Sequence, residues 1–473
     1  MEPDCSIKRV RFFFTAGRGM DRFLIPELTH KAAAVDIEAT PGKVFFSAEP
    51  DMCRLTQIKS GERLFLLLHK GPSLSLPKHK GNALSVLRQV VIGENRIWKD
   101  SLGIWQNLQE PLQQEERMHG DHFKVARRKL EKEPTLHGSE LCKEEHDAVD
   151  ETSMFHLKTL NSSIPQPEGQ AHSNAGERNK AQPLPAKAWR AITFRVSCRC
   201  SGANAKLFSS EEVGRAIGIS LVKLLGWKPD LRRPDLEVFV HLNDLYSVVG
   251  FPVVRQPLAS RGYIRNTGLR STTAWAMASL AEINAGAVVL DPMCGVGTIL
   301  LEGAKEWPHV QFIGIDISDS QIKSATGNVK AAGVAGSIEL VKGSVLDLPV
   351  LSESIDVVIS DIPFGKKFTS SKNMKDLLPE ILQEMERVLR VGGSIVLLLS
   401  QSLHRHLKAL FQFEATRPEN VLPPKNETGI AASTVNRTNW SESLIPIESH
   451  SVSLGVTEAV IFKCRKSSKS TAC

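Results

Sequence analysis

The sequence predicts an α/β protein whose carboxyl-terminal half forms a mainly parallel sheet, with an α+β region before it. From about Thr267 onward, apolar segments of strand length alternate with helical segments; the strands are AVVLDP, VQFIGIDI, SIELVKG, IDVVISDI and SIVLLLS. This alternation is typical of right-handed βαβ units, which build a parallel sheet covered on both faces. Upstream, strands and single helices are mixed, and 473 residues exceed what one compact core accommodates.

The first region, residues 1–107, is predicted to be an α+β unit. The runs VRFFFTA, KVFFSA and ERLFLLLHK predict strands, and GMDRFLIPELTHKAAA and GNALSVLRQVV predict helices. Residues 108–187 are rich in Gln, Glu, Lys, His, Ser, Asn and Pro, with few apolar residues and no period. We expect this second segment to be a disordered polar insertion.

A further α+β segment occupies residues 188–266. AITFRVSCRC alternates as a strand, SSEEVGRAIGISLVKLLGW predicts a helix capped by Ser209 or Ser210, and LEVFVHLNDLYSVVGF predicts a β-hairpin. Nine basic residues are interleaved with its apolar positions: Arg190, Arg195, Arg199, Lys206, Arg215, Lys223, Lys228, Arg232 and Arg233. This pattern suits phosphate contacts on a folded surface, although an evenly solvated basic surface would look the same.

The predicted parallel sheet occupies residues 267–466. After its last parallel strand, FQFEATRP and the hairpin HSVSLGVTEAVIFKCR are expected to close the edge of the sheet. Between them, residues 417–443 are rich in Asn, Thr, Ser and Pro and predict a loop insertion, and residues 467–473 are expected to form a tail.

Composition narrows the class of protein. Lys and Arg exceed Asp and Glu by 59 to 52, and an isoelectric point near 8.9 favours an anionic partner. The eight cysteines form no CxxC pair and no repeated spacing, so we expect reduced intracellular thiols and no metal site. No run approaches the roughly 18 apolar residues of a membrane span, and we expect a soluble intracellular protein without a membrane partner.

The first strand of the parallel sheet runs into LDPMCGVGTILLEGA, which we interpret as a cofactor loop. Gly295 and Gly297 allow a tight turn and close approach of a ligand to the backbone. Leu300 stands where a dinucleotide-binding loop would have its third glycine, and no phosphate-binding P-loop is present. Asp291, which precedes the glycines, suits a cationic amino group better than a pyrophosphate.

The second strand ends in IGIDIS and adds a site for a ribose. The carboxylate of Asp316 can accept hydrogen bonds from both hydroxyls of a ribose diol, and we place Ile317 in the same site. A nucleoside with an amino-acid tail, S-adenosylmethionine, satisfies all of these features. DPMCGVGT and GIDIS resemble the corresponding motifs of class I (Rossmann-like) methyltransferases, which implies that cofactor and methyl transfer.

One position departs from that resemblance. After the third strand, where many class I methyltransferases have an acid facing the adenine amine, KGSVLDLP places Ser344. Asp347 either takes over that contact or caps a helix. We include Ser344 and Asp347 among the expected cofactor residues.

The fourth strand ends in SDIPFG, an unusual sequence for a simple turn. The amine of a nucleobase is a poor nucleophile because its lone pair is delocalised into the ring. Asp361 and the carbonyl of Ile362 can accept its hydrogens, Pro363 fixes the backbone direction, and Phe364 can stack on the base. These four residues are the predicted catalytic set, with Asp361 either orienting the amine or also removing its proton.

DIPFG after this cofactor loop resembles the guanosine N2-methyltransferases that carry an amino-terminal THUMP domain. The segment FRVSCRCSGANAKLFSSEEVGRAIGISLVKLLGWKPDLRRPDLEVFVHL is similar to a THUMP domain, with residues 1–107 as the ferredoxin-like part of that module. YIRNTGLRSTTAWAMASLA resembles the segment leading to the catalytic domain, which implies substrate contacts for Arg270 and Thr272.

The resemblance also implies a substrate and partners. It implies a structured small RNA, either tRNA or small nuclear RNA, with 2-methylguanosine as the product and a small zinc-binding activator subunit. The nucleus is then expected rather than the cytoplasm. Two alternatives stay open at this point: an N6-adenine methyltransferase, whose pocket would hold a similar amine, and a non-catalytic RNA-binding THUMP protein.

Overall fold

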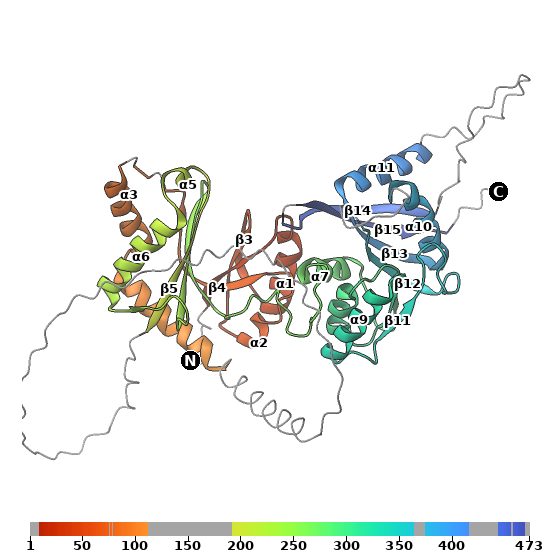
Figure 1. Cartoon of the computed structure of the whole chain (residues 1–473), viewed down its shortest axis with the longest axis horizontal. Helices are drawn as coiled ribbons and strands as arrows, with labels where there is room; N and C mark the ends of the chain where they lie inside the picture. Colours follow the sequence, from red (N-terminus) through yellow and green to blue (C-terminus); the bar gives the residue numbers. More distant parts are fainter. Residues whose placement is uncertain are drawn as a thin grey trace, which may run out of the picture. The chain divides into compact units, whose positions relative to one another are not determined.

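The computed structural model describes residues 9–74, 76–77, 79–111, 192–363, 374–415, 443–455 and 457–468. They form two sheets, one of eight strands and one of seven (Figure 1). The second sheet is mostly parallel, and the predicted fold class is confirmed. Most of the predicted polar insertion and of the predicted loop at 417–443 lies outside the described residues.

The eight-stranded sheet combines the two α+β segments of the sequence. Its strands are β1 (Val10–Thr15), β2 (Val35–Thr40), β3 (Lys43–Ala48), β4 (Arg63–Pro72), β5 (Thr193–Cys200), β6 (Lys228–Pro229), β7 (Leu236–Leu242) and β8 (Tyr246–Pro252). They lie in the order β2-β3-β1-β4-β8-β7-β5-β6. The antiparallel pairing of β4 with β8 joins strands from the two segments, so one continuous sheet runs through both.

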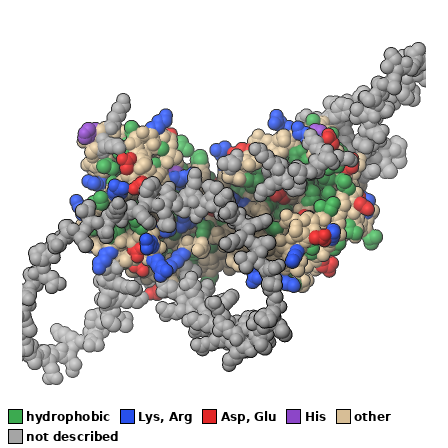
Figure 2. Space-filling model, in the orientation of Figure 1, with side chains coloured by type: hydrophobic (Ala, Val, Ile, Leu, Met, Phe, Trp, Pro, Cys, Tyr) green, Lys and Arg blue, Asp and Glu red, His purple; other side chains and the backbone are tan. Residues whose placement is uncertain are grey.

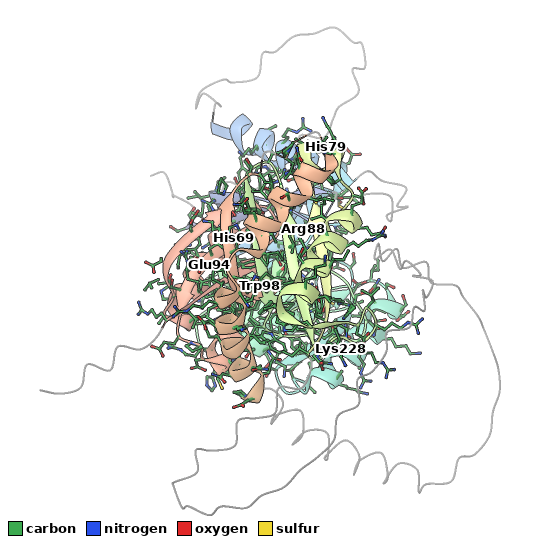
Figure 3. All side chains as sticks on the ribbon, turned by 90° about the vertical axis from the view of Figure 1, so that its left-hand side faces the viewer. His69, His79, Arg88, Glu94, Trp98 and Lys228 are labelled. Carbon is green, nitrogen blue, oxygen red and sulfur yellow. The ribbon has the colours of Figure 1, made fainter. Side chains whose placement is uncertain are left out.

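The helices of this part are α1 (Asp21–Ala32), α2 (Met52–Leu55), α3 (Lys80–Leu87), a π-helical turn η1 (Arg88–Ile92), a helix over residues 95–111, α5 (Ala203–Leu207) and α6 (Ser210–Leu225). Ser209 caps α6 through a reciprocal capping box with Glu212, as one of the two expected caps. In Figure 3, α3 and α6 lie side by side, and Trp98 points from its helix into the core.

Aromatic packing holds the middle of this sheet together. The ring of Phe13 on β1 stacks on Phe65 of β4 with centroids 4.7 Å apart and also contacts Phe239 of β7 at 6.2 Å. The intervening strand β8 carries Gly250 at this point, because the Phe13 ring occupies the space where a side chain would stand. The sheet therefore buries aromatic side chains from non-adjacent strands in one cluster.

The seven-stranded sheet has the predicted alternation. Its strands are β9 (Val288–Asp291), β10 (Gln311–Asp316), β11 (Ile338–Lys342), β12 (Ile355–Asp361), β13 (Leu389–Ser400), β14 (Leu444–Ser453) and β15 (Glu458–Lys466), in the order β11-β10-β9-β12-β13-β15-β14. The first five strands are parallel, and the hairpin β14–β15 adds antiparallel to β13, as expected.

Helices cover both faces of this sheet (Figure 1). They are α7 (Ser271–Leu280), α8 (Thr298–Glu306), α9 (Asp319–Ala332), α10 (Met374–Val388) and α11 (Gln401–Ala415). On one face, apolar residues of α10 and α11 pack against alternate residues of β12 and β13, including Val358 and Leu397. No described helix of the chain combines the length and apolar character needed to cross a membrane.

The prediction of a strand at FQFEATRP is wrong for its first five residues, which belong to α11. Leu403, Leu407, Leu410 and Phe411 all pack in one core cluster, and their spacing of three or four residues is helical. The short alternation F-Q-F resembles a strand only when it is read without the helical period of the residues that precede it.

Gly250 provides a test of the aromatic cluster. A Cβ at this position would lie 2.6 Å from the Phe13 ring and 2.8 Å from the carbonyl oxygen of Leu66. We expect Gly250→Ala to lower the free energy of unfolding by about 1–3 kcal/mol, since the backbone contact cannot be relieved by a rotamer change. Chemical denaturation measures this loss. Gly262→Ala, which meets nothing within 4 Å, is the matched control; an equal effect at both positions would contradict the packing argument.

Candidate active site

Three carboxylates meet at the carboxyl edge of the parallel sheet. Asp316, Asp291 and Asp361 are the last residues of β10, β9 and β12, which are adjacent strands. The chain moves from β9 outward to β10 and β11, and then returns to start β12 on the other side of β9. Ligands of open α/β sheets bind where the strand order reverses in this way.

Asp291 is the most enclosed of the three and is 2% exposed. Its Oδ1 atom accepts hydrogen bonds from the hydroxyl of Ser360, at 3.0 Å, and from the backbone N–H of Met293, at 3.2 Å. Burial raises the pKa of Asp291 to about 8 against the effect of these bonds, and the charges of Asp361 and Asp316 add to the rise. A cation placed here would favour the ionised carboxylate.

Asp361 is half-buried at the end of β12, and burial raises its pKa to about 7. The next residue, Ile362, is fully buried, and its N–H donates to the carbonyl oxygen of Leu398 at 3.1 Å. Pro363 follows, half-buried. The structure thus fixes the backbone just after the carboxylate. Phe364, the fourth residue of the predicted catalytic set, lies outside the described residues.

The cofactor loop has the predicted conformation. Gly295 and Gly297 have φ angles of 52° and 82°, in the left-handed region that favours glycine, and Gly297 is the N-cap of α8. Asp316 braces this loop: its Oδ2 atom accepts the N–H of Gly295 at 2.9 Å, and Oδ1 accepts the N–H of Ser318 at 2.8 Å. Each oxygen retains a second acceptor site for a ligand.

The remaining predicted cofactor residues lie beside this loop. Ile317 follows Asp316 and is 72% exposed, an unusual exposure for a large apolar side chain. Ser344 and Asp347 close a tight turn after β11, in which the N–H of Asp347 donates to the carbonyl of Ser344 at 3.2 Å. Between β11 and β12 no helix is present in this fully described stretch, so the helix-cap interpretation of Asp347 is wrong.

The two residues implied as substrate contacts lie at the start of α7 and have different environments. Arg270 is the N-cap residue, and its half-exposed guanidinium forms an ion pair with Glu62. Thr272 is 1% exposed and packs inside the first turn of the helix. The structure therefore leaves Arg270 accessible and buries Thr272.

Sequence reasoning missed Asn328, a fully buried residue of α9. It connects the cofactor loop to the segment that leads into the catalytic domain, here called the leading segment. Its Oδ1 atom accepts the backbone N–H groups of Arg265 and Asn266, both at 2.9 Å. Its Nδ2 atom donates to the carbonyl oxygens of Asn266, at 2.9 Å, and Val296, at 3.0 Å. All four hydrogen-bonding positions of the amide are used, which makes it a rigid clamp.

A buried ion pair, also missed, fixes the same leading segment. Arg261 and Glu302 of α8 have side chains 4% and 1% exposed, and the guanidinium donates to both carboxylate oxygens at 3.0–3.2 Å. Tyr263 donates its hydroxyl to the same carboxylate at 2.7 Å, and Arg261 also donates to the carbonyl of Lys59. An arginine and a glutamate 41 positions apart carry no recognisable signal in a single sequence.

Comparison with known proteins assigns the family. Residues 178–246 match the model of the THUMP domain, and residues 259–421 match that of the RMKL-like methyltransferase domain. The chain is 45% identical over 488 aligned residues to the U6 snRNA (guanine-N(2))-methyltransferase THUMPD2 of Bos taurus, covering 97% of this chain and 96% of that protein. The chain belongs to the THUMP-domain guanine-N2 methyltransferase family.

One further relative and one solved structure are less similar to this chain. The tRNA (guanine(6)-N(2))-methyltransferase THUMP3 of Mus musculus is 33% identical over 46% of this chain and 45% of its own length. The crystal structure of TrmN from Thermus thermophilus aligns with a TM-score of 0.59 and 18% identity, covering 97% of this chain and all of that one. This last likeness supports the fold.

S-adenosylmethionine, the cofactor of this family, fits the residues present. It carries a sulfonium and an ammonium group, and no salt bridge joins Asp291, Asp316 or Asp361 to a described basic side chain. The left-handed glycines leave backbone accessible in the loop, and Ile317 offers an exposed apolar surface beside the Asp316 carboxylate. The site therefore offers negative charge, a ribose acceptor and an apolar contact to one cationic nucleoside.

Asn328 provides a test of the clamp. In Asn328→Asp, a charged acceptor would face two carbonyl oxygens that now receive N–H donors. We expect a loss of about 3 kcal/mol or more in the free energy of unfolding, since burying unsatisfied groups and a charge costs this much. Denaturant titration measures the loss. Asn284→Asp, at an exposed position, is the control and should change stability by less than about 0.5 kcal/mol; a similar small effect at Asn328 would show that the clamp is dispensable.

Proposed function

We propose that this chain transfers a methyl group from S-adenosylmethionine to the exocyclic N2 amine of a guanosine in a structured small RNA, with U6 small nuclear RNA as the first candidate and tRNA as the second. The observation that carries the proposal is Asp361, an ionisable acceptor without a described salt bridge, at the end of the strand beside the cofactor loop. The product would be 2-methylguanosine.

Each residue of the cofactor site has a proposed role. Asp291 holds the ammonium group, Gly295 and Gly297 admit the ligand to the backbone, and Asp316 accepts from the ribose hydroxyls. Ile317 contacts the adenine ring, and Ser344 with Asp347 contacts its amine from the turn after β11. When bound, S-adenosylmethionine supplies an electrophilic methyl group on sulfur.

The acceptor amine is held by the residues that follow β12. Asp361 and the carbonyl oxygen of Ile362 accept its two hydrogens and turn its lone pair towards the methyl group. The buried N–H of Ile362, bonded to Leu398, and the ring of Pro363 prevent the backbone from shifting during this contact. Phe364 stacks on the base, and Arg270 leads the RNA to this pocket. Thr272 is 1% exposed, so its role is to pack the first turn of α7 and not to contact the RNA.

Contacts to the rest of the RNA come from the THUMP region. A single extruded guanine offers too few contacts to select an RNA, and extrusion itself costs a few kcal/mol. Figure 2 shows Lys and Arg side chains over the region that Figure 1 labels β5 and α6. Seven of the nine basic residues noted in the sequence are exposed: Arg199, Lys206, Arg215, Lys223, Lys228, Arg232 and Arg233.

We propose a small zinc-binding protein as an activator subunit, and the nucleus as the compartment. Large apolar side chains are exposed on both edge strands of the described seven-stranded sheet. Val341 on β11 is 37% exposed, and Ile445 and Ile447 on β14 are 49% and 50% exposed. A partner that covers such an edge would bury them. Co-expression followed by zinc analysis of the purified complex tests this proposal; full activity of the isolated chain would contradict it.

The reaction is tested by mass spectrometry of digested RNA. The full chain, with and without the proposed activator, is incubated with S-adenosylmethionine and either U6 RNA or a tRNA mixture. We expect 2-methylguanosine from the U6 reaction. N6-methyladenosine as the only product would overturn the choice of amine, and the absence of any methylated nucleoside together with retained RNA binding would point to a non-catalytic protein.

Asp361→Ala tests the acceptor role. We expect the methylation rate to fall at least about 10²-fold, the usual effect of losing a preorganised electrostatic contact to the reacting group. Cofactor affinity, measured by calorimetry, should stay nearly unchanged. Asp316→Ala is the reciprocal variant and should weaken cofactor binding instead. Retention of more than about a tenth of the rate by Asp361→Ala would contradict the orienting role.

Arg232 and Arg233 test the RNA surface. Their backbone N–H groups both donate to the carboxylate of Asp230, at 2.9 Å, so the loop is braced independently of their side chains. We expect the double change to Glu to weaken RNA binding at least about tenfold at low salt and to flatten the dependence of affinity on salt. Lys323→Glu with Lys330→Glu places the same charge change on α9 of the catalytic domain as a control. If both pairs have equal effects, the THUMP region is not the preferred RNA surface.

A further inference from the structure

Cys198 and Cys200 form a pair of sulfur atoms at the edge of the eight-stranded sheet. They stand two positions apart on β5 and therefore project from the same face of the strand. Their Sγ atoms are 3.9 Å apart, within hydrogen-bonding distance for sulfur, and both side chains are half-buried. Neither residue takes part in the proposed methyl transfer.

Within the described part of the chain, this edge of the strand has no ladder partner at the two cysteines. The short strand β6 pairs only with Thr193 and Phe194, at the start of β5. Beyond that point, among the described residues, β5 has a ladder partner on one side only, the parallel strand β7. The two cysteines are thus on an edge segment, which can deform more readily than a central strand.

The facing side of α6 consists of small residues that leave room for the sulfur pair. Ser210, Gly214 and Gly218 recur at intervals of four along the helix. A methyl group on Gly214 would lie 3.5 Å from Cβ of Cys198, and one on Gly218 would lie 3.8 Å from Val196. Ser210 accepts the backbone N–H of Cys200 at 3.0 Å. Larger residues at these positions would press on the strand and its sulfur atoms.

The two thiols are chemically unequal. A hydrogen bond from the Cys198 thiol lowers the pKa of Cys200, and the hydroxyl of Ser210 adds a second such bond against the opposing effect of burial. The same contact with Cys200 raises the pKa of Cys198, and burial adds to that rise. A nucleophilic thiolate next to a thiol that can resolve its oxidation product is the arrangement found in redox-sensing cysteine pairs.

We propose that Cys198 and Cys200 are a reversible oxidation site that forms an intrastrand disulfide on reaction with a peroxide. The thiolate of Cys200 attacks one peroxide oxygen, the O–O bond breaks, and one water leaves after protonation, giving a sulfenic acid. The sulfur of Cys198 then displaces the hydroxyl of that sulfenic acid as a second water, with loss of its proton. Two thiols lose two electrons in total, and hydrogen peroxide becomes two waters.

The resulting disulfide would be strained and easily reduced. Two residues of an extended strand span roughly 6.6 Å between Cα atoms, close to the upper limit of about 6.8 Å for a disulfide. Closing the bond to about 2.0 Å between sulfur atoms therefore puckers the strand at Arg199, which stands between the cysteines. Strained disulfides have higher reduction potentials, which suits reversible regulation rather than structural stabilisation.

Tryptic mapping gives a direct test, because cleavage after Arg199 separates the two cysteines. Reduced full-length protein is treated with hydrogen peroxide under native conditions, blocked with N-ethylmaleimide and digested. We expect Val196–Arg199 and Cys200–Lys206 to appear as one cross-linked pair two hydrogens lighter than their sum, and to separate after treatment with dithiothreitol. Cys53, an exposed thiol outside this pair, is the internal control and should carry the maleimide or a simple oxide.

Two variants check the order of events. In Cys198→Ser, the sulfenic acid at Cys200 should persist and be trapped by dimedone; in Cys200→Ser, oxidation at Cys198 should be slower by about tenfold or more. Circular dichroism confirms that both variants are folded. The proposal is overturned if peroxide oxidises Cys53 while both cysteines of the pair stay reduced, or if Cys200 proceeds to sulfinic acid without any cross-linked peptide.

Discussion

The constraint on which the catalytic half depends is the meeting of Asp291, Asp316 and Asp361 at the ends of adjacent strands. Burial and mutual repulsion raise the pKa of Asp291, so the sheet holds this arrangement at a cost in stability. The apolar layer beneath α10 and α11, and the hydrogen bond from Ser360 to Asp291, keep the strand ends in register despite that cost. A cationic cofactor relieves the repulsion, which links the stability of this edge to ligand binding.

The segment that leads into the catalytic domain depends on the same edge through two polar anchors. Asn328 joins residues 265 and 266 to the carbonyl of Val296 in the cofactor loop, and Glu302 holds Arg261 and Tyr263 in a buried cluster. Both anchors lie on helices, α9 and α8, that directly follow strands of the site. Any movement of the leading segment is therefore transmitted to the loop that would hold the cofactor, through hydrogen bonds that are costly to break when buried.

Local chemistry explains which features the sequence made predictable. Strand ends, the glycine turn and the cap at Ser209 follow from residue types that favour one conformation, and each was predicted. The contacts of Asn328 were not predictable, because in the sequence it looks like any polar residue inside a helix. The pairing of β4 with β8 was not predictable either, because it joins segments far apart in the chain. The FQFEA segment was misassigned because a two-residue alternation is too short to outweigh the helical period before it. Contacts with residues distant in the chain decide these three features, and a single sequence does not show such contacts.

Each of the two sheets buries an ionisable group, and the two groups carry charges of opposite sign when ionised. In the eight-stranded sheet, Lys43 is 3% exposed and bonds to His241 and Tyr246, with no salt bridge to a described carboxylate. Burial, together with the nearby charge of Arg199, lowers its pKa to about 7. A nearby anion would favour the charged amine, just as a nearby cation would favour the ionised carboxylates of the other sheet. Each sheet therefore holds a buried ionisable group at an electrostatic cost, a carboxyl in one case and an amine in the other.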